Sequence, residues 1–315
     1  MSLGIILSCS KDDALVVNED EELILAYLDS AGLTDQASRD ETGFYAYPIT
    51  INPSGKTQAS GSVLGIHYKL YRLDGMLIDV YDSLDGDTLI MKQGVNAIYP
   101  VGIDYALSYL KEGEEWGFII PSKLAYGDYS YSTLIPENTI IRIDIKLLEI
   151  RSDDDVLEED LRAISKHFTD AGLRDTVAYP GFKPEVLPNG MIYMTLEGGS
   201  GSTPATDQLV SVTYEGRLLD STVFQRAPNA DLFEFYYNRG IVIPGFETGV
   251  GKMKLQEKAI FYMPSYLGYR ESAQIIPSVQ AIVSDLVEME VIPSYVEKVG
   301  PFEPLIFEIR LIDIN

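Results

Sequence analysis

The chain has 315 residues, 46% of them hydrophobic, which is enough for two domains of about 150 residues each. Its 24 Lys and Arg against 48 Asp and Glu give a formal net charge of −24. A phosphate backbone is held by clustered basic side chains, so this charge argues against a nucleic-acid partner. With 2 histidines and 1 cysteine the chain cannot assemble a zinc or Cys–His site, and we expect neither a metal nor a cofactor. Motifs for phosphate cradles and serine hydrolases are absent from the sequence.

The cysteine, Cys9, follows a short apolar run and precedes an acidic segment. This arrangement resembles the lipobox of bacterial lipoproteins, in which the signal is cleaved before the cysteine and the cysteine is lipidated. The alternative is a frayed terminus with an accidental cysteine. We expect residues 1–21 to be a truncated lipoprotein signal with an extended acidic leader, and lipid on Cys9 to be the protein's contact with a membrane. The location would then be extracytoplasmic, in the periplasm or on the surface of a Gram-negative bacterium.

The first half of the chain opens with apolar residues at helical spacing that end before Gly32, which predicts a helix. A strand is predicted over 44–51. Apolar and polar residues then alternate over 64–70, and again over 141–147, with a short helix from Ile103 between them. Alternation with a period of two predicts an antiparallel sheet with one buried face and one wet face.

The second half repeats this order after a charged segment, 151–156, which we expect to be a linker. A helix is predicted from Leu157 to Gly172, a strand over 191–196 and a short helix from Phe246. Alternating strands are predicted over 210–214 and 305–311. Each half therefore predicts an α+β domain, an antiparallel sheet of four to six strands curled around one short helix. The predicted domains are 22–150 and 157–315. The acidic runs at 18–22 and 152–155 lack the spaced ligands of a calcium loop and are expected to be solvated.

One short motif is present in both halves. FIIPSKLAYGD at 118–128 matches FYMPSYLGYRE at 261–271 when 143 is added to each number. Each copy ends an apolar strand with a proline and places a tyrosine five residues further on, at Tyr126 and Tyr269.

These motifs, with IHYKLYRLDGMLID at 66–79 and VSVTYEGRLLDSTVFQ at 211–226, resemble the core of FKBP-type peptidyl-prolyl isomerases. The resemblance covers roughly residues 60–150 and 207–315. It implies a twisted antiparallel sheet wrapped on one helix, with an apolar pocket between them. It also implies proline-containing polypeptides as clients, with folding of exported proteins as the role.

The resemblance carries a set of site residues to each half. In the first half it implies Asp79 and Tyr126 as the catalytic pair. The wall of that pocket is aliphatic where phenylalanines are usual in the family, and Ile103 stands where the family has tryptophan. The second half keeps an aromatic wall, but Gln225 occupies the aspartate position. The implied substrate-binding residues are Tyr68, Ile78, Leu89, Ile98, Tyr99, Ile103, Tyr131, Leu134, Ile135 and Ile143 in the first half, and Tyr214, Phe224, Gln225, Phe233, Val242, Ile243, Phe246, Tyr269 and Phe307 in the second.

The second half carries an insert near 275–295, with 21 extra residues between Tyr269 and the last strand. Val279, Ile282, Leu286 and Met289 recur in it at helical spacing. The insert could be a lid, a surface for a partner or simple packing. We expect it to cover or narrow the second pocket, since an apolar helix face must be buried and that pocket is the nearest concave surface.

Two functions remain open at this stage. One is a prolyl isomerase, for which we expect the first domain to be the more active because it keeps the carboxylate of Asp79. The other is a non-catalytic binding module, a chaperone or scaffold that keeps the fold for protein contacts.

Overall fold

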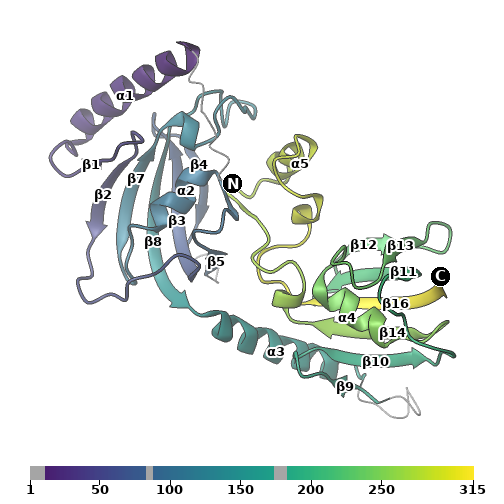
Figure 1. Ribbon diagram of the computed structural model, residues 1–315. Helices are drawn as coiled ribbons and strands as arrows, with labels where there is room; N and C mark the ends of the chain where they lie inside the picture. The colour runs from purple at the N-terminus through teal and green to yellow at the C-terminus, as the bar shows by residue number, and fades with distance from the viewer. Residues whose placement is uncertain (1–10, 83–87, 174–182) are drawn as a thin grey trace, which may run out of the picture. The chain divides into compact units, whose positions relative to one another are not determined.

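The computed structural model describes residues 11–82, 88–173 and 183–315. The chain divides into two compact units (Figure 1). The first unit is the chain through Arg151 together with a returning segment, Ala273–Met289. The second unit is Ser152–Ser272 with Glu290–Asn315. Cys9 lies outside the described residues, and none of the helices within them is long and apolar enough to cross a membrane.

The first unit is built on an antiparallel sheet with the strand order β1-β2-β7-β8-β3-β4, and β5 also pairs with β3. Its inner face follows the predicted alternation, since Leu64, Ile66, Tyr68 and Leu70 are at most 3% exposed. The strands are β1 (Ser38–Arg39), β2 (Tyr45–Thr50), β3 (Val63–Arg72), β4 (Leu77–Tyr81), β5 (Leu89–Lys92), β7 (Glu115–Ile120) and β8 (Ile141–Arg151).

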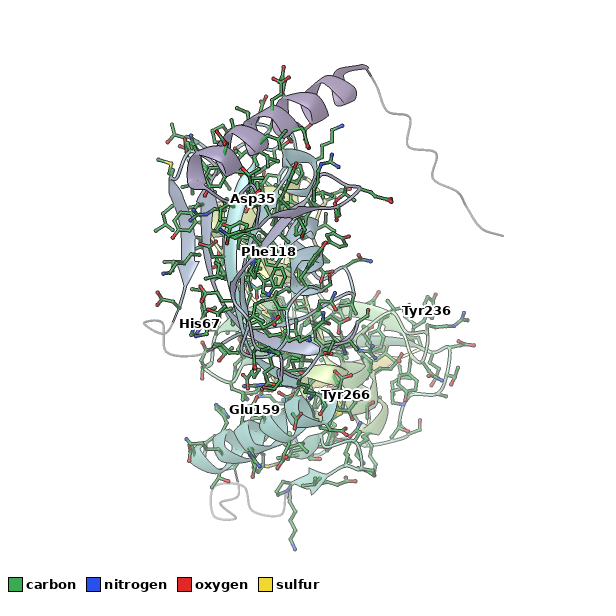
Figure 2. All side chains as sticks on the ribbon, turned by 90° about the vertical axis from the view of Figure 1, so that its left-hand side faces the viewer. Asp35, His67, Phe118, Glu159, Tyr236 and Tyr266 are labelled. Atoms are coloured by element: carbon green, nitrogen blue, oxygen red, sulfur yellow. The ribbon has the colours of Figure 1, made fainter. Side chains whose placement is uncertain are left out.

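A helix lies on each face of this sheet. Helix α1 (Lys11–Ala31) buries Ile24 and Leu28 against aromatic and aliphatic side chains of the outer face. Helix α2 (Val101–Leu107) begins two residues before the predicted start and buries Ile103 completely. Gly102 allows this helix to approach closely, because a Cβ there would lie 2.4 Å from Cγ2 of Ile120. Phe118, labelled in Figure 2, is fully buried in the same unit.

The second unit repeats the arrangement. Its sheet has the order β12-β11-β16-β14-β10-β9, with β13 also paired to β11. Helix α4 (Pro244–Lys252) lies in the position of α2, and helix α3 (Asp153–Asp170) packs on the outer face through Ile164 and Phe168. The strands are β9 (Glu185–Val186), β10 (Ile192–Glu197), β11 (Leu209–Leu218), β12 (Val223–Ala227), β13 (Phe233–Tyr236), β14 (Lys258–Met263) and β16 (Leu305–Ile314).

Two expectations about acidic segments are wrong. The leader is not extended, since α1 begins at Lys11. The boundary between the units, after Arg151, does fall in the 151–156 segment, and from Asp153 onward this segment is the start of α3. Glutamate is a good helix former, and acidic residues are stabilised near helix N-termini. Ser152 forms a capping box with Asp155, which explains why three consecutive aspartates can begin a helix. Nor is the 18–22 run fully solvated, because Glu21 accepts hydrogen bonds from Tyr45 and Arg39.

The outer helices, α1 and α3, hold the duplicated motif in the same way in both units. After Pro121, the backbone N–H of Ser122 donates to the carboxylate of Asp20 at 2.8 Å. After Pro264, the N–H of Ser265 donates to Asp160 at 2.7 Å. Each serine opens a 3-10 helix, η1 (Ser122–Leu124) or η2 (Ser265–Leu267), whose first N–H groups need acceptors. Both carboxylates are about 5% exposed, so each outer helix holds the loop that carries a site tyrosine.

The buried carboxylate of Asp160 makes the stability of the fold depend on pH. Burial raises the pKa of Asp160 from its ordinary value of 3.8 to about 6, against the opposing effect of hydrogen bonds from Ser265. A carboxyl with a raised pKa in the folded chain stabilises the fold fully below the unfolded pKa, and this stabilisation is lost as pH rises through the folded pKa. We therefore expect wild-type stability, relative to Asp160→Asn, to fall between about pH 4 and pH 7. Urea unfolding of both proteins across this range tests it; a constant difference would contradict it.

Candidate functional site

The first unit places the predicted acid beside a tyrosine. Strands β3 and β4 pair Leu70 with Asp79, which brings Asp79 next to Tyr68 on the same face. The hydroxyl of Tyr68 donates to the carboxylate at 2.6 Å. Burial, the charge of Asp79 and this hydrogen bond raise the pKa of Tyr68. The phenol therefore stays protonated and holds the carboxylate in a fixed orientation.

Tyr126 lies close to this pair. Its ring meets Tyr99 edge to face, with centroids 6.0 Å apart, and its side chain is only 3% exposed. Burial raises the pKa of Tyr126 well above its usual value, and the neighbouring Tyr99 and Asp79 raise it further. The hydroxyl is thus a proton donor throughout the physiological pH range. It donates to the backbone carbonyl of Ile276 at 2.5 Å.

The remaining predicted residues of the first site fall on five elements and on one loop. Ile78 is on β4, Ile143 on β8 and Ile103 on α2, and each is at most 9% exposed. Tyr131 and Ile135 exchange backbone hydrogen bonds in the loop that follows η1. Leu89 begins β5, Ile98 and Tyr99 form the short strand β6, and Leu134 is half-buried in the same loop as Tyr131.

The expectation that the insert covers the second pocket is wrong. Residues 273–289 belong to the first unit, and they supply none of the described residues that line the second cavity. Helical periodicity shows that α5 (Gln280–Glu288) has an apolar face but does not show which surface buries it. The insert therefore lies at the first site instead, where Tyr126 contacts Ile276. Only the end of the predicted insert, at Tyr295, reaches the second site.

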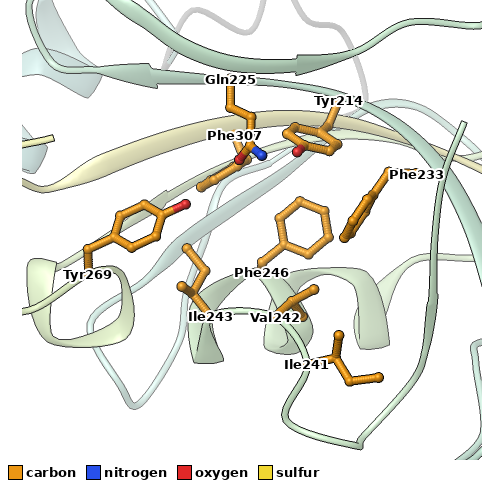
Figure 3. A pocket seen from close by; sticks show the side chains of 9 residues that line it. All are labelled: Tyr214, Gln225, Phe233, Ile241, Val242, Ile243, Phe246, Tyr269 and Phe307. Carbon is orange, nitrogen blue, oxygen red and sulfur yellow. The ribbon is translucent and has the colours of Figure 1, made fainter. Parts of the chain in front are cut away.

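The second unit contains an apolar cavity of about 190 Å³ between its sheet and α4 (Figure 3). Phe246, on α4, lies at its centre and meets Tyr214 and Phe307 edge to face, with centroids 5.3 and 5.2 Å apart. Phe224 is not among the lining residues but meets Phe307 edge to face, with ring centroids 5.6 Å apart. The lining residues are Tyr214, Gln225, Phe233, Ile241, Val242, Ile243, Phe246, Tyr269 and Phe307. All except Ile241 were predicted from the sequence.

Three of the lining residues carry polar side-chain groups, namely the hydroxyls of Tyr214 and Tyr269 and the amide of Gln225. Figure 3 shows the hydroxyl of Tyr269 and the amide of Gln225 pointing into the cavity from two different elements. The ring of Tyr269 stacks on Tyr295, with centroids 4.1 Å apart, so η3 (Ser294–Glu297) fixes the direction of the hydroxyl. Burial, and to a smaller extent Tyr295, raises the pKa of Tyr269, which keeps the phenol a donor. Tyr295 could not be predicted as a site residue from the sequence, because its role depends on where the insert returns to the second unit.

In each site a small side chain is compensated by a larger one at a neighbouring position, but the two sites place the large and small residues the other way round. In the second unit Gly216 makes room for aromatic rings, since a Cβ there would lie 2.7 Å from Phe224 and 2.9 Å from Phe307. Leu70 occupies the equivalent register position in the first unit, opposite Asp79 as Gly216 is opposite Gln225. It is fully buried. The larger Leu70 therefore offsets the smaller Ile78 and Ile143, and the aliphatic first site stays filled with apolar atoms.

A metal site is not formed by the described residues, which contain no cluster of three or more His, Cys, Asp or Glu placed to hold an ion. Both sites instead combine apolar walls with a tyrosine hydroxyl, and the first adds a carboxylate.

A model of the FKBP-type peptidyl-prolyl cis-trans isomerase family matches residues 55–148 and 200–312. The chain belongs to this family, and its two matched regions lie on either side of the boundary after Arg151.

Its relatives include the probable FKBP-type peptidyl-prolyl cis-trans isomerase FkpA of Neisseria meningitidis serogroup B, which is 29% identical over 70% of this chain and 74% of the relative. Human peptidyl-prolyl cis-trans isomerase FKBP9 is 26% identical over 73% of this chain, but the match spans only 35% of the human protein. Among solved structures, the three FKBP domains of wheat FKBP73 align over 87% of this chain and 96% of that structure, at 16% identity and a TM-score of 0.34. A Pseudomonas syringae isomerase aligns over 52% of this chain and 97% of its own, at 23% identity and a TM-score of 0.36.

Proposed function

We propose that the chain catalyses cis–trans rotation about X–Pro bonds in polypeptides. The observation that carries this proposal is the second cavity, an aromatic pocket whose polar groups include the Tyr269 hydroxyl. A volume of about 190 Å³ suits a small apolar group such as a proline ring. The hydroxyl lies where it can meet a neighbouring carbonyl.

The chemistry needs no nucleophile. Amide resonance opposes rotation with a barrier of ~18–20 kcal/mol. A site that binds the twisted amide more tightly than either planar form lowers this barrier. Apolar walls contribute by removing water from the charge-separated planar amide, and a phenol hydroxyl orients the carbonyl. Selective stabilisation of about 4 kcal/mol corresponds to roughly a thousandfold rate.

In the first site we propose Asp79 and Tyr126 as the residues that act on the substrate. Tyr126 would donate to the substrate carbonyl, and Asp79, held by Tyr68 at 2.6 Å, would act on the twisted amide. Because Gln225 offers only a neutral dipole, we propose that the first site has the higher intrinsic activity once it is free. The carboxylate of Asp79, at the position equivalent to Gln225, supports the higher activity of the first site.

The isomerisation rate of a proline tetrapeptide, measured with the full chain, tests the proposal. We expect acceleration that saturates with peptide concentration and is lost when the chain is unfolded. The rival function is a non-catalytic binding module, which the missing carboxylate at Gln225 favours. A folded chain that binds the peptide without accelerating its isomerisation would establish that rival.

We further propose exported, proline-containing polypeptides as clients and lipid on Cys9 as the anchor. Support comes from the sequence around Cys9, in which a short apolar run and serine precede the cysteine. Expressed in a bacterial cell, the protein carrying Cys9→Ser should move from the membrane fraction to the soluble fraction, while Ser10→Ala should leave the distribution as in wild type. Membrane attachment of the Cys9→Ser protein would contradict the anchor.

A further inference from the structure

The insert adds a strand to the first site. Residues Gln274–Ile275 form β15, which pairs in parallel with β6 (Ile98–Tyr99). The N–H of Gln274 donates to the carbonyl of Ala97 at 2.7 Å, and the N–H of Ile276 donates to that of Tyr99 at 2.9 Å. Strand addition of this kind is a common way to bind an extended peptide, with backbone hydrogen bonds fixing the register. The peptide here is a segment of the same chain.

The register brings an X–Pro dipeptide to the site tyrosine. Ile276 precedes Pro277, and its carbonyl is the oxygen of the amide that joins the two residues. That oxygen accepts the hydrogen bond of Tyr126 at 2.5 Å. Both Ile276 and Pro277 are buried. The donor that we assign to a substrate carbonyl is therefore used by the carbonyl of the chain's own X–Pro bond.

Helix α5 anchors this segment to the same unit. Its face formed by Ile282, Val283 and Leu286 is at most 8% exposed. The hydroxyl of Tyr129, three residues after Tyr126, donates to Asp285 at 2.9 Å. Burial raises the pKa of Tyr129, and the hydrogen bond to Asp285 raises it further, so the donor persists at neutral pH. The helix contacts thus hold the dipeptide in place independently of the strand pairing.

We propose that the insert is an intrachain competitor, which occupies the first site by binding Ile276–Pro277 as a client's X–Pro bond would be bound. The proposal rests on the proposed function, because it describes the regulation of that site. A tethered segment has an effective concentration on the order of millimolar, so clients at micromolar concentration compete poorly with it. The first site is then available only in the fraction of molecules whose insert has detached.

Three substitutions on α5 of the full chain test the proposal. Leu286→Asp places a charge on the buried face and should detach the insert. Asp285→Ala is the milder variant, which removes the hydrogen bond of Tyr129 without disturbing the apolar face. Glu288→Ala is the matched control, since Glu288 is exposed at the end of the same helix.

The first measurement is amide hydrogen exchange at Gln274 and Ile276. We expect slow exchange in wild type and in Glu288→Ala. Exchange should become roughly two- to tenfold faster in Asp285→Ala, the range expected for one hydrogen bond, and faster still in Leu286→Asp. Fast exchange of both amides in wild type would show that the segment is not bound, and would overturn the proposal.

The second measurement is binding of a fluorescent proline tetrapeptide, and the third is its isomerisation. Detachment should tighten peptide binding at the first site by the same factor as it speeds exchange, in addition to the binding at the open second cavity. It should also raise the isomerisation rate by an amount that Tyr126→Phe then removes. Detachment of the insert with unchanged peptide binding at the first site would overturn the proposal that the insert is a competitor. If no variant isomerises the peptide, the proposed function fails, while tighter binding in Leu286→Asp still supports the competitor and unchanged binding still rejects it.

Discussion

Replacing Phe246 with alanine should lower the free energy of unfolding of the second unit by about 3–5 kcal/mol, the range for a buried Phe cut to Ala. Phe246 is 3% exposed. Its ring centroid lies 5.3 Å from that of Tyr214, 5.8 Å from Phe235 and 5.2 Å from Phe307. Removing the ring takes away the packing contact that these three partners share in the second cavity. Urea unfolding, followed by hydrogen exchange in β11 and β16 to isolate the second unit, measures the loss.

The matched control is Ile241→Ala. Ile241 lines the same cavity but is 60% exposed, so its truncation should change stability by no more than about 0.5 kcal/mol. Equal losses for the two variants would show that Phe246 does not carry the packing assigned to it.

Gly216→Leu should destabilise the second unit by about 1–3 kcal/mol, the usual result of overpacking. A Cβ at this position would already lie 2.7 Å from the ring of Phe224. The first unit solves the same problem with Leu70 beside Ile78, so adding Phe224→Ile to Gly216→Leu should recover part of the loss. Thermal unfolding of the two single variants and the double variant provides the comparison.

The double-variant cycle separates two explanations of Gly216. If the glycine is needed to make room for the ring, the two substitutions should couple favourably and the double variant should be more stable than Gly216→Leu alone. If the stability losses of the two substitutions simply add, making room for the ring of Phe224 is not the reason for a glycine at position 216.

Much of the fold could be predicted because it depends on local periodicity. Alternation over 64–70 and 305–311 indicated the buried sheet faces, and the residues at alternate positions are buried as expected. Helix α3 was predicted, but it begins at Asp153, four residues before the predicted start at Leu157. Val156, Asp160, Ile164 and Phe168 are buried there, while Leu161 is 36% exposed.

The rest depends on pairs of residues that the sequence does not bring together. The spacing of apolar residues in α5 predicts a helix, but the surface that buries it is set by Tyr129 and β6, more than 100 residues earlier in the chain. The exchange between Leu70 and Gly216 becomes visible only when the strand register is known. The buried pair of Asp160 and Ser265 could have been suspected, since Asp20 and Ser122 recur at nearly the same offset.

The central claim is that one chain carries two prolyl-isomerase sites, of which the second is open and the first is occupied by its own insert. The most direct test is the isomerisation rate of a proline tetrapeptide by the full chain, by Tyr126→Phe and by Tyr269→Phe. We predict that wild type accelerates the reaction, that Tyr269→Phe lowers its kcat/KM, and that Tyr126→Phe leaves it almost unchanged until Leu286→Asp detaches the insert. A rate that falls with Tyr126→Phe in the otherwise intact chain, and not with Tyr269→Phe, would contradict this account.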